Sequence, residues 1–477
     1  MKTGDTGFCP VYKKCGGCQL QNLTYPQQLR YKQNRVTELL GRFHAVSPII
    51  GMENPLHYRN KVQAAFGTAR NGKIVSGVYQ SSTHRIVPVD SCMIEDETAD
   101  AIIVTVRRLC QSFGIPAYNE HTCRGFLRHV LVKRGFSSGQ IMVVLVGSGP
   151  VFPDRNHFVK ALLKEHPTIT TILHNINPYR TSLVLGEQEK ILYGPGKIED
   201  TLCGCLFRIS ARSFYQVNPV QTERLYGKAI EYAGLTGGER VIDAYCGIGT
   251  IGIVAARHCE QVLGIELNRE AVTDAIANAR RNGLKNIRFY NADAGEFLEE
   301  MAAQGEQADV VMMDPPRAGS SEKFLGSVAR LSPQRVVYIS CNPETLQRDL
   351  NILTAKGYRV KAIQPVDMFP FTNHVETVVL LSKGEVDSKK IRVEFSLEDM
   401  DMSEFQDGAT YPQIKEYVLE HTGLKVSNLY ISQIKRKCGI EVGKNYNLPK
   451  SEDSRQPQCP PEKEKAIREA FNYFGMI

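Results

Sequence analysis

The stretch Asp243-Ala-Tyr-Cys-Gly-Ile-Gly-Thr-Ile-Gly252 lies between an apolar run at residues 240–243 and a helical pattern at residues 251–258. A glycine-rich turn between a strand and a helix is typical of an α/β sheet that binds a nucleotide-like cofactor. The pattern continues outward, with helices predicted at 269–282 and 294–303 and strands at 261–266, 287–291, 310–314, 335–340, 360–366 and 375–381. This alternation predicts a Rossmann-like, doubly wound α/β domain over residues 208–384.

Glycines and carboxylates stand at the carboxyl ends of these predicted strands, where open α/β sheets bind their ligands. Glycines let the backbone pass close to a ligand, and a carboxylate after the second strand can accept hydrogen bonds from ribose hydroxyls. The candidate residues are Gly247, Gly249, Glu266, Asp293 and Asp314. They suit either a dinucleotide or S-adenosylmethionine. Asp314-Pro-Pro-Arg317 favours methyl transfer, because hydride transfer has no evident need for that tetrapeptide.

Cys341 follows the strand at 335–340 and directly precedes Asn342-Pro-Glu344, a typical helix start. The positive end of a helix favours thiolate over thiol, so we predict a nucleophilic cysteine. A thiolate that adds to carbon 6 of uracil makes carbon 5 nucleophilic, and a base must then remove the carbon 5 proton. Glu376 is the predicted base, at the end of an adjacent element of the sheet. Taken singly, the two residues could be a core thiol and a surface acid.

The first part of the chain, residues 1–207, is predicted to be an α+β domain with a mostly antiparallel sheet. A helix is expected at 25–40, and strands at 60–68, 73–79, 128–134, 140–147, 170–175 and 182–185. Asn71-Gly72 between the first two strands is a strong hairpin signal. Basic residues and tyrosines alternate over the first 85 positions, a mixture that suits RNA as well as an ordinary solvated surface.

Four cysteines of this domain form a candidate metal site. Cys9, Cys15 and Cys18 are spaced C-x5-C-x2-C, and Cys92 is the expected fourth ligand. Four thiolates suit zinc or a 4Fe-4S cluster, and their spacing does not separate the two.

The chain as a whole has 477 residues, of which 42% are hydrophobic and 23% are charged, and carries a net charge of +7. We expect two to four domains, no membrane span, no signal peptide and a cytoplasmic location. Residues 383–390 are predicted to be a polar linker. Residues 385–477 are predicted to be a mainly helical extension, with a helix-turn-helix pattern at 410–437 and a last helix at 462–474.

Six motifs resemble the RNA 5-methyluridine methyltransferases, and most closely the RumA-type enzymes of bacterial 23S ribosomal RNA. They are Ser213-Phe-Tyr-Gln-Val-Asn-Pro219, residues 243–252, Gly264-Ile-Glu-Leu-Asn268, Asp314-Pro-Pro-Arg317, Ser340-Cys-Asn-Pro343 and Asn373-His-Val-Glu376. The resemblance covers residues 8–382 and implies a class I S-adenosylmethionine methyltransferase domain. It makes Cys341 the nucleophile, Glu376 the proton acceptor, and Cys9, Cys15, Cys18 and Cys92 the ligands of a 4Fe-4S cluster, with zinc the weaker alternative. The implied cofactor contacts are Gln216, Tyr245, Glu266 and Asp314, followed by Thr250 and Asp293.

The resemblance implies 23S ribosomal RNA as partner, and we expect a monomer. Only eight residues precede Cys9, so we expect no TRAM domain, the small RNA-binding barrel that often begins this family. The extension after residue 383 could bind RNA through Lys435-Arg-Lys437 instead, or serve as a packing module. Two functional alternatives stay open: the same chemistry on the T-loop of transfer RNA, and a non-catalytic, metal-bearing RNA-binding protein.

Overall fold

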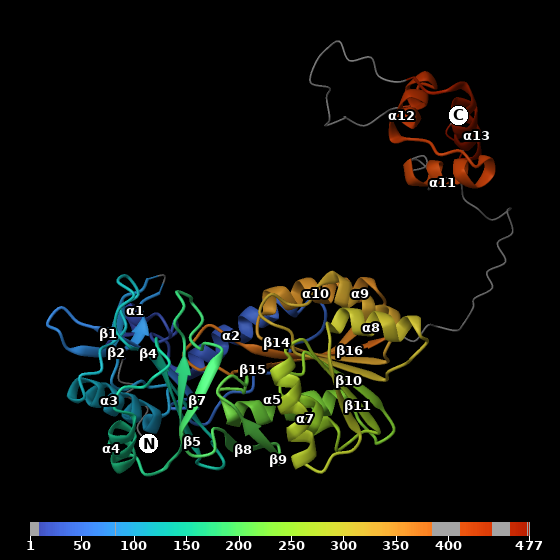
Figure 1. Ribbon diagram of the computed structural model, residues 1–477. Coiled ribbons are helices and arrows are strands. Elements are labelled where there is room, and N and C mark those ends of the chain that lie inside the picture. The colour runs from blue at the N-terminus through green and yellow to red at the C-terminus, as the bar shows by residue number, and fades with distance from the viewer. Residues whose placement is uncertain (1–8, 82, 384–410, 441–457, 475, 477) are drawn as a thin grey trace. The chain divides into compact units, whose positions relative to one another are not determined.

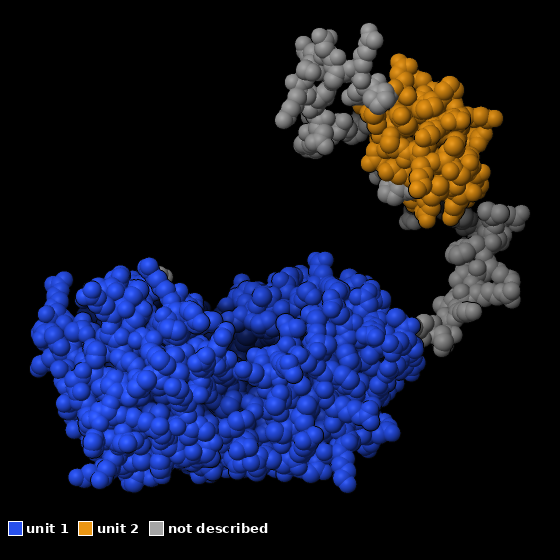
Figure 2. All heavy atoms as spheres, in the orientation of Figure 1, with its two compact units in different colours: residues 1–386 blue, residues 387–477 orange. Residues whose placement is uncertain are grey.

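The computed structural model describes residues 9–81, 83–383, 411–440, 458–474 and 476. Two compact units are present, residues 1–386 and residues 387–477 (Figure 2), and each is described by itself. Within the described ranges, no helix is both long and apolar enough to cross a membrane. The predicted linker at 383–390 lies outside the described residues, apart from Lys383.

A seven-stranded mixed sheet organises the second half of unit 1 in the order β12-β11-β10-β13-β14-β16-β15 (Figure 1). Its strands are β10 (Arg240–Ala244), β11 (Gln261–Glu266), β12 (Ile287–Asn291), β13 (Val310–Met313), β14 (Arg335–Ser340), β15 (Tyr358–Val366) and β16 (Glu376–Lys383). The first five run parallel, and β16 is antiparallel to both β14 and β15. Every strand predicted in this region is confirmed, with ends that differ by two residues at most.

Helices cover both faces of this sheet. One core contains side chains of α5 (Pro219–Ala233), α6 (Thr250–Ala255) and α7 (Arg269–Arg281). The other contains side chains of α2 (Tyr25–Leu40), α8 (Ala294–Ala303), α9 (Glu322–Leu331) and α10 (Pro343–Ala355). Because both faces of the sheet are covered, the central strands β10, β11, β13 and β14 are mainly apolar, whereas the edge strands β12 and β15 also carry polar residues. The carboxyl ends of β10, β11, β13 and β14 therefore meet at one edge, where the candidate residues stand.

The other seven-stranded sheet, called the first sheet because it comes earlier in the chain, occupies the first half of unit 1 in the order β3-β2-β1-β4-β5-β6-β7. The sheet of β10 to β16 is called the second sheet. Its strands are β1 (Lys61–Thr68), β2 (Ile74–Tyr79), β3 (Ile86–Pro88), β4 (Leu127–Arg134), β5 (Ile141–Gly147), β6 (Ile169–Ile176) and β7 (Gln188–Tyr193). All neighbours pair antiparallel except β5 and β6. Helices α3 (Glu97–Ser112) and α4 (Arg155–Glu165) pack on one face of it. The Asn71-Gly72 hairpin is confirmed, since it joins β1 to β2.

In this region one predicted strand is wrong, and α3, α4 and one hairpin were not predicted. Residues 182–185 form a bend rather than a strand, because the Asn177 side-chain amide donates to the carbonyls of Leu183 (2.8 Å) and Val184 (3.1 Å). The strand follows later, as β7. The hairpin of β8 (Ile198–Leu202) and β9 (Cys205–Ile209) was not predicted, although its strands alternate buried and partly exposed residues.

The N-terminal segment crosses to the other sheet. Val36 and Leu40 of α2 are buried in the core that contains α8, α9 and α10, and Val46 and Ile50 form bridges to β15. A short helix, α1 (Tyr12–Cys15), precedes it. Residues 36–50 thus pack against the predicted methyltransferase domain, and the boundary predicted near residue 207 stays a prediction.

Unit 2 contains the helices α11 (Tyr411–Thr422), α12 (Asn428–Lys437) and α13 (Pro461–Tyr473), which share one apolar core. Gly423 follows α11 in the left-handed region at φ 69°, and Ser427 caps α12 by accepting from the Tyr430 amide. Two of the three basic residues proposed to touch RNA are engaged inside the unit: Lys437 pairs with Glu464 at 2.6 Å, and Lys435 lies over the Tyr411 ring. Packing therefore accounts for part of this basic cluster.

Candidate active site

Cys341 and Glu376 are brought together by the pairing of β14 with β16. The antiparallel ladder ends with Ser340 opposite Thr377. Cys341 directly follows Ser340 and Glu376 directly precedes Thr377, so both residues lie at this end of the ladder, and the charge of Glu376 acts on the Cys341 thiol. The predicted adjacency of the two elements is confirmed. Asn342 then caps α10 by accepting from the Glu344 amide at 3.2 Å, so the chain turns into the helix directly after the thiol.

Electrostatics at this edge oppose ionisation. Burial, with Glu376 and Asp314 nearby, raises the pKa of the Cys341 thiol to about 11. Burial, followed by the charge of Asp314, raises the pKa of Glu376 to about 8, and burial raises the pKa of Asp314 to about 7. The expectation that the helix start makes Cys341 a thiolate is therefore wrong for the protein without its ligands. Desolvation and two carboxylates outweigh the helix dipole.

Arg317 is the residue of this site that the sequence analysis did not assign. It is exposed, and its positive charge lowers the pKa of both Cys341 and Glu376. Its carbonyl accepts from the Asn342 side-chain amide (3.3 Å) and from the Thr345 hydroxyl (3.2 Å), which ties the Asp-Pro-Pro-Arg turn to the start of α10. The sequence signal was its place at the end of Asp314-Pro-Pro-Arg317, the tetrapeptide that favoured methyl transfer.

The glycine loop folds back on the carboxylate of Glu266. Glu266 accepts from the amides of Gly247 (3.1 Å) and Asn268 (2.8 Å), which leaves lone pairs of both oxygens free for other donors. Gly249 has φ 81°, and a Cβ there would lie 2.8 Å from the Phe289 ring, so only glycine fits. A Cβ at Gly247, by contrast, would meet no atom within 4 Å. The loop therefore leaves open space beside it.

The other predicted cofactor residues have distinct local roles. Tyr245 adopts φ 65° and packs against Phe324, and the Thr250 hydroxyl lies 3.0 Å from that of Tyr226. Asp293 caps α8 through the Glu296 amide at 3.0 Å. Gln216 is buried in the segment that leads to α5. Gly247, Glu266 and Asn268 are thus joined directly, whereas no hydrogen bond in the described chain joins Asp293 or Gln216 to them.

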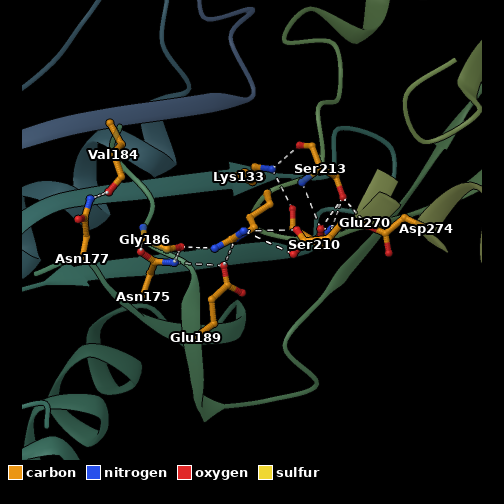
Figure 3. Close-up of polar contacts among 11 residues, drawn as sticks. Lys133, Asn175, Asn177, Val184, Gly186, Glu189, Ser210, Ser213, Glu270 and Asp274 are labelled. Carbon is orange, nitrogen blue, oxygen red and sulfur yellow. Dashed lines mark hydrogen bonds and ion pairs between the residues drawn. The ribbon is translucent and has the colours of Figure 1, made fainter. Parts of the chain in front are cut away.

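A polar network holds the segment that carries Gln216 (Figure 3). Lys133 of β4 donates to the carbonyls of Ser210 and Ser213, both at 2.8 Å, and both hydroxyls donate to Asp274 of α7. Arg212 donates to the Gly186 carbonyl and pairs with Glu270. The segment is therefore fixed between the two sheets, which positions Gln216 without touching it.

The loop between β15 and β16, which ends at Glu376, is held by the N-terminal segment. Phe371 has φ 67°; its amide donates to the Gln28 side chain at 2.8 Å, and its carbonyl accepts from the Leu20 amide at 2.9 Å. Three more side chains donate hydrogen bonds to carbonyls of this loop. The pairs are Lys32 with Phe369, Arg35 with Asn373, and Tyr58 with Pro370. The position of Glu376 thus depends on residues more than 300 positions earlier in the chain.

At the base of this loop, Lys32 and Asp367 form a fully buried ion pair at 2.5 Å. Burial lowers the pKa of Lys32, and the second Asp367 oxygen has no hydrogen-bond partner among the described residues. Lys32→Met leaves that carboxylate buried and unpaired, and should lower the free energy of unfolding by about 3 kcal/mol or more, measured by urea unfolding.

Two control variants complete the Lys32 test. Lys32→Met/Asp367→Leu should recover most of the stability, because no charge then stays buried. Lys323→Met removes an exposed pair with Glu296 (3.2 Å) and should cost less than about 1 kcal/mol. Equal losses from Lys32→Met and Lys323→Met would contradict the importance of the buried pair.

The four predicted ligand cysteines line one cavity of about 410 Å³. Burial raises the pKa of Cys15, and raises that of Cys18 to about 11 and that of Cys92 to about 12. Among the described residues, no group of three or more His, Cys, Asp or Glu is placed to hold a metal ion. Cys18 and Cys92 pack with Tyr58 and Phe371, so this cavity borders the loop that leads to Glu376.

Comparisons with known proteins agree with the fold and the motifs. Residues 203–384 match the tRNA (uracil-5-)-methyltransferase family model. An uncharacterized RNA methyltransferase of Halalkalibacterium halodurans is 47% identical over 378 residues, which cover 78% of this chain and 82% of that protein. One of Clostridium acetobutylicum is 44% identical, covering 79% and 83%.

A solved structure extends the comparison beyond the second sheet. The tRNA (uracil-54, C5)-methyltransferase of Pyrococcus abyssi, in complex with S-adenosyl-L-homocysteine, superposes with a TM-score of 0.65 at 27% identity. The superposition covers 80% of this chain and 88% of that structure. With relatives this similar over most of its length, the chain belongs to the RNA (uracil-5-)-methyltransferase family, and it is an RNA methyltransferase.

Proposed function

We propose that this protein uses S-adenosylmethionine to methylate carbon 5 of a specific uridine in 23S ribosomal RNA, acting as a monomer. The observation that carries the proposal is the position of Cys341 and Glu376 at the same end of the β14–β16 ladder, at the edge that also holds Asp314 and Arg317. A nucleophile and a base beside one ring are what carbon 5 methylation requires.

S-adenosylmethionine would bind at the glycine loop and supply the methyl group. The open space beside Gly247 and the free lone pairs of Glu266 fit a ligand with a ribose. Tyr245, Gly249, Thr250, Asp293 and Gln216 would complete this site, as the family resemblance implies. Asp314 is partly buried directly after β13, where a carboxylate favours a positively charged ligand. The Pyrococcus abyssi relative, solved with S-adenosyl-L-homocysteine, supports S-adenosylmethionine as the cofactor.

The protein's own residues would carry the chemistry in three steps. Cys341 Sγ forms a bond to carbon 6 of the flipped-out uracil, and carbon 5 becomes the nucleophile that takes the methyl group. Glu376 then accepts the proton from carbon 5. The electron pair of that C–H bond restores the double bond of the ring and expels the Cys341 thiolate. Loss of the accepted proton from Glu376 to solvent then returns the enzyme to its starting state.

The raised pKa values of Cys341 and Glu376 indicate a further role for Arg317. Glu376 must be ionised to accept a proton and Cys341 must be ionised to attack, yet burial disfavours both charges. Arg317 is the nearby cation that lowers both pKa values. We expect a positively charged ligand at Asp314 to act in the same direction, so the nucleophile would be activated when the site is occupied.

A 4Fe-4S cluster held by Cys9, Cys15, Cys18 and Cys92 is part of the proposal. The four thiols line one cavity, although among the described residues no three of them are placed to hold a metal ion; the family resemblance favours a cluster over zinc. When bound, the cluster would keep these thiols ionised and tie the segments of Cys18 and Cys92 together beside Phe371.

Metal analysis tests the cluster. Protein purified without oxygen should contain iron and acid-labile sulfide, each at about four atoms per chain, and Cys92→Ser should lower both. Cys110→Ser, at a buried thiol away from the cavity, should leave both contents unchanged. Stoichiometric zinc in place of iron would contradict the cluster.

Transfer RNA is the second candidate substrate. The matched family model carries a transfer RNA description, and the Pyrococcus abyssi relative acts on uracil 54 of transfer RNA. The cluster cysteines favour ribosomal RNA, since the transfer RNA branch of the family generally lacks them.

One experiment separates the two substrates. The anaerobically purified full-length protein is incubated with S-adenosylmethionine and unmodified 23S RNA or transfer RNA, and 5-methyluridine is mapped by mass spectrometry. Methylation of one 23S uridine is expected. Methylation of transfer RNA alone would keep the chemistry and overturn the substrate.

A further inference from the structure

A cavity of about 430 Å³ opens on the first sheet, away from the proposed catalytic residues. Tyr79, Gln63 and His129 line it, from the adjacent strands β2, β1 and β4. The opposite face of these strands is buried against α3 and α4, through residues such as Val62, Ala64 and Val130. The cavity therefore lies on the face that those two helices leave uncovered.

Two consecutive buried residues, Arg128 and His129, both line this cavity. Neighbours in a regular strand point to opposite faces, but the pairing of β4 with β5 slips between Leu127 and His129, which leaves Arg128 as an extra residue. Such β-bulges redirect side chains and are frequent at functional sites. The irregularity thus gathers two polar side chains on one cavity.

Both residues have unused hydrogen-bonding capacity. Arg128 is 3% exposed; its Nη1 donates to the carbonyls of Asn177 (2.8 Å) and Tyr179 (2.6 Å), but its Nε has no partner in the described chain. His129 is 6% exposed, and its Nδ1 likewise has none there. Burial lowers the pKa of His129 to about 4, so the ring is neutral at pH 7. Buried polar atoms without partners cost stability and are often explained by a ligand.

Aromatic and charged groups surround these two residues. The Arg128 guanidinium lies 4.6 Å above the Tyr118 ring, and the Tyr79 ring stands edge-on to His129 at 6.2 Å. Exposed Arg180 lines the rim. The Tyr79 ring can stack on a base, the buried polar groups of Arg128 and His129 can bind the polar edge of that base, and Arg180 at the rim can bind its phosphate.

The cavity adjoins the one that holds the four cysteines. Gln63 lines both, and the cysteine cavity also contains Arg59 and Lys61. Lys133, which continues the same face of β4 beyond His129, contacts the segment of Ser210 and Ser213 (Figure 3). One sheet face therefore connects this cavity to the segment that leads to the proposed cofactor site.

We propose that the cavity of Tyr79, Arg128 and His129 binds one unpaired nucleotide of the RNA substrate, distinct from the uridine that is methylated. The base packs on the Tyr79 ring, and an acceptor atom of the base accepts a hydrogen bond from Arg128 Nε–H. Arg180 forms an ion pair with the phosphate. This inference rests on the proposed function, since it needs an RNA substrate, and it adds a second recognition point on that RNA.

The test uses the full-length protein and the unmodified 23S RNA fragment that the methylation assay identifies. Tyr79→Leu and Arg180→Ala should each raise the Kd for this RNA about tenfold, with the loss of activity in KM rather than in kcat. Lys160→Ala is the matched control: it removes an exposed cation on α4, which covers the opposite face, and should change Kd less than twofold. Thermal unfolding of each variant shows whether it is folded.

Cross-linking by ultraviolet light identifies the bound nucleotide. The peptide that contains Tyr79 should cross-link to a nucleotide other than the methylated uridine. The inference is overturned if Tyr79→Leu and Arg180→Ala bind RNA like the wild type, if the cross-link falls on the methylated uridine, or if free adenosine or uridine monophosphate fills the cavity without competing with RNA. In each of those cases methylation by the wild type still stands, so the proposed function is judged separately.

Discussion

Cys341→Ala should abolish methylation of carbon 5, by a factor on the order of 10⁴ or more, because it removes the proposed nucleophile that adds to carbon 6. The thiol is partly buried at the end of β14 and precedes the cap of α10, so removing one sulfur atom leaves the Asn342 cap in place. Transfer of a labelled methyl group to RNA measures the loss. Calorimetry should show that binding of S-adenosylmethionine is retained.

Cys259→Ala is the matched control for this prediction. Cys259 is also a buried thiol of the second sheet, but it precedes β11 at the edge opposite the carboxyl ends of the strands. Its removal should leave methyl transfer within about threefold of the wild type. Activity of Cys341→Ala above about 1% of the wild-type rate would contradict the covalent mechanism.

Glu376→Gln should slow turnover about 10²- to 10⁴-fold and accumulate RNA covalently attached to the protein. Glutamine has nearly the shape of glutamate but cannot accept the carbon 5 proton, so the thiolate cannot leave. Glu376 is buried, and burial with the nearby Asp314 raises its pKa to about 8, which suits a base that works near neutral pH. A denaturing gel of labelled RNA detects the adduct.

Glu344→Gln provides the comparison for this variant. Glu344 is a partly exposed acid in the first turn of α10, close to Cys341 in the chain, and pairs with Arg35. It should form no stable adduct and should turn over at nearly the wild-type rate. If Glu376→Gln turned over normally, or stopped without any adduct, another residue would have to be the base.

The second sheet could be predicted from the sequence because both of its faces are buried. Its central strands are mainly apolar runs bounded by polar turns, so their positions and the adjacency of Cys341 and Glu376 followed from pattern alone. The first sheet was harder. Residues 182–185 have an apolar strand-like pattern, yet the Asn177 amide holds them in a bend, a contact that local sequence does not reveal.

Long-range contacts explain the rest of what the sequence could not predict. The Cys341 pKa depends on two carboxylates from other strands, so the local helix-start argument pointed in the wrong direction. In the sequence, Lys32 is one of many basic residues among the first 85 positions. In the structure it is buried and pairs with Asp367, 335 positions away. Its spacing from Gln28 and Val36 on the buried face of α2 was the one available signal.

The N-terminal segment carries three of the cysteines of the proposed cluster, and it also holds the loop that ends at Glu376. It supplies Gln28, Lys32 and Tyr58 to the loop that ends at Glu376, and it places Cys18 beside Phe371 of the same loop. A change of structure around the cysteines would therefore displace Glu376, the proposed base, through these packed side chains. A role of the cluster in holding this loop needs no electron transfer.

RNA containing 5-fluorouridine at the methylated position gives the most direct test of the central claim. Fluorine on carbon 5 leaves no proton for Glu376 to accept, so the bond between Cys341 Sγ and carbon 6 should persist after methyl transfer. Mass spectrometry of the digested wild-type protein should find the peptide around Cys341 linked to a nucleotide that carries both fluorine and the new methyl group. A link to a different cysteine, or methyl transfer to unmodified RNA with no trapped adduct on the fluorinated RNA, would contradict the account.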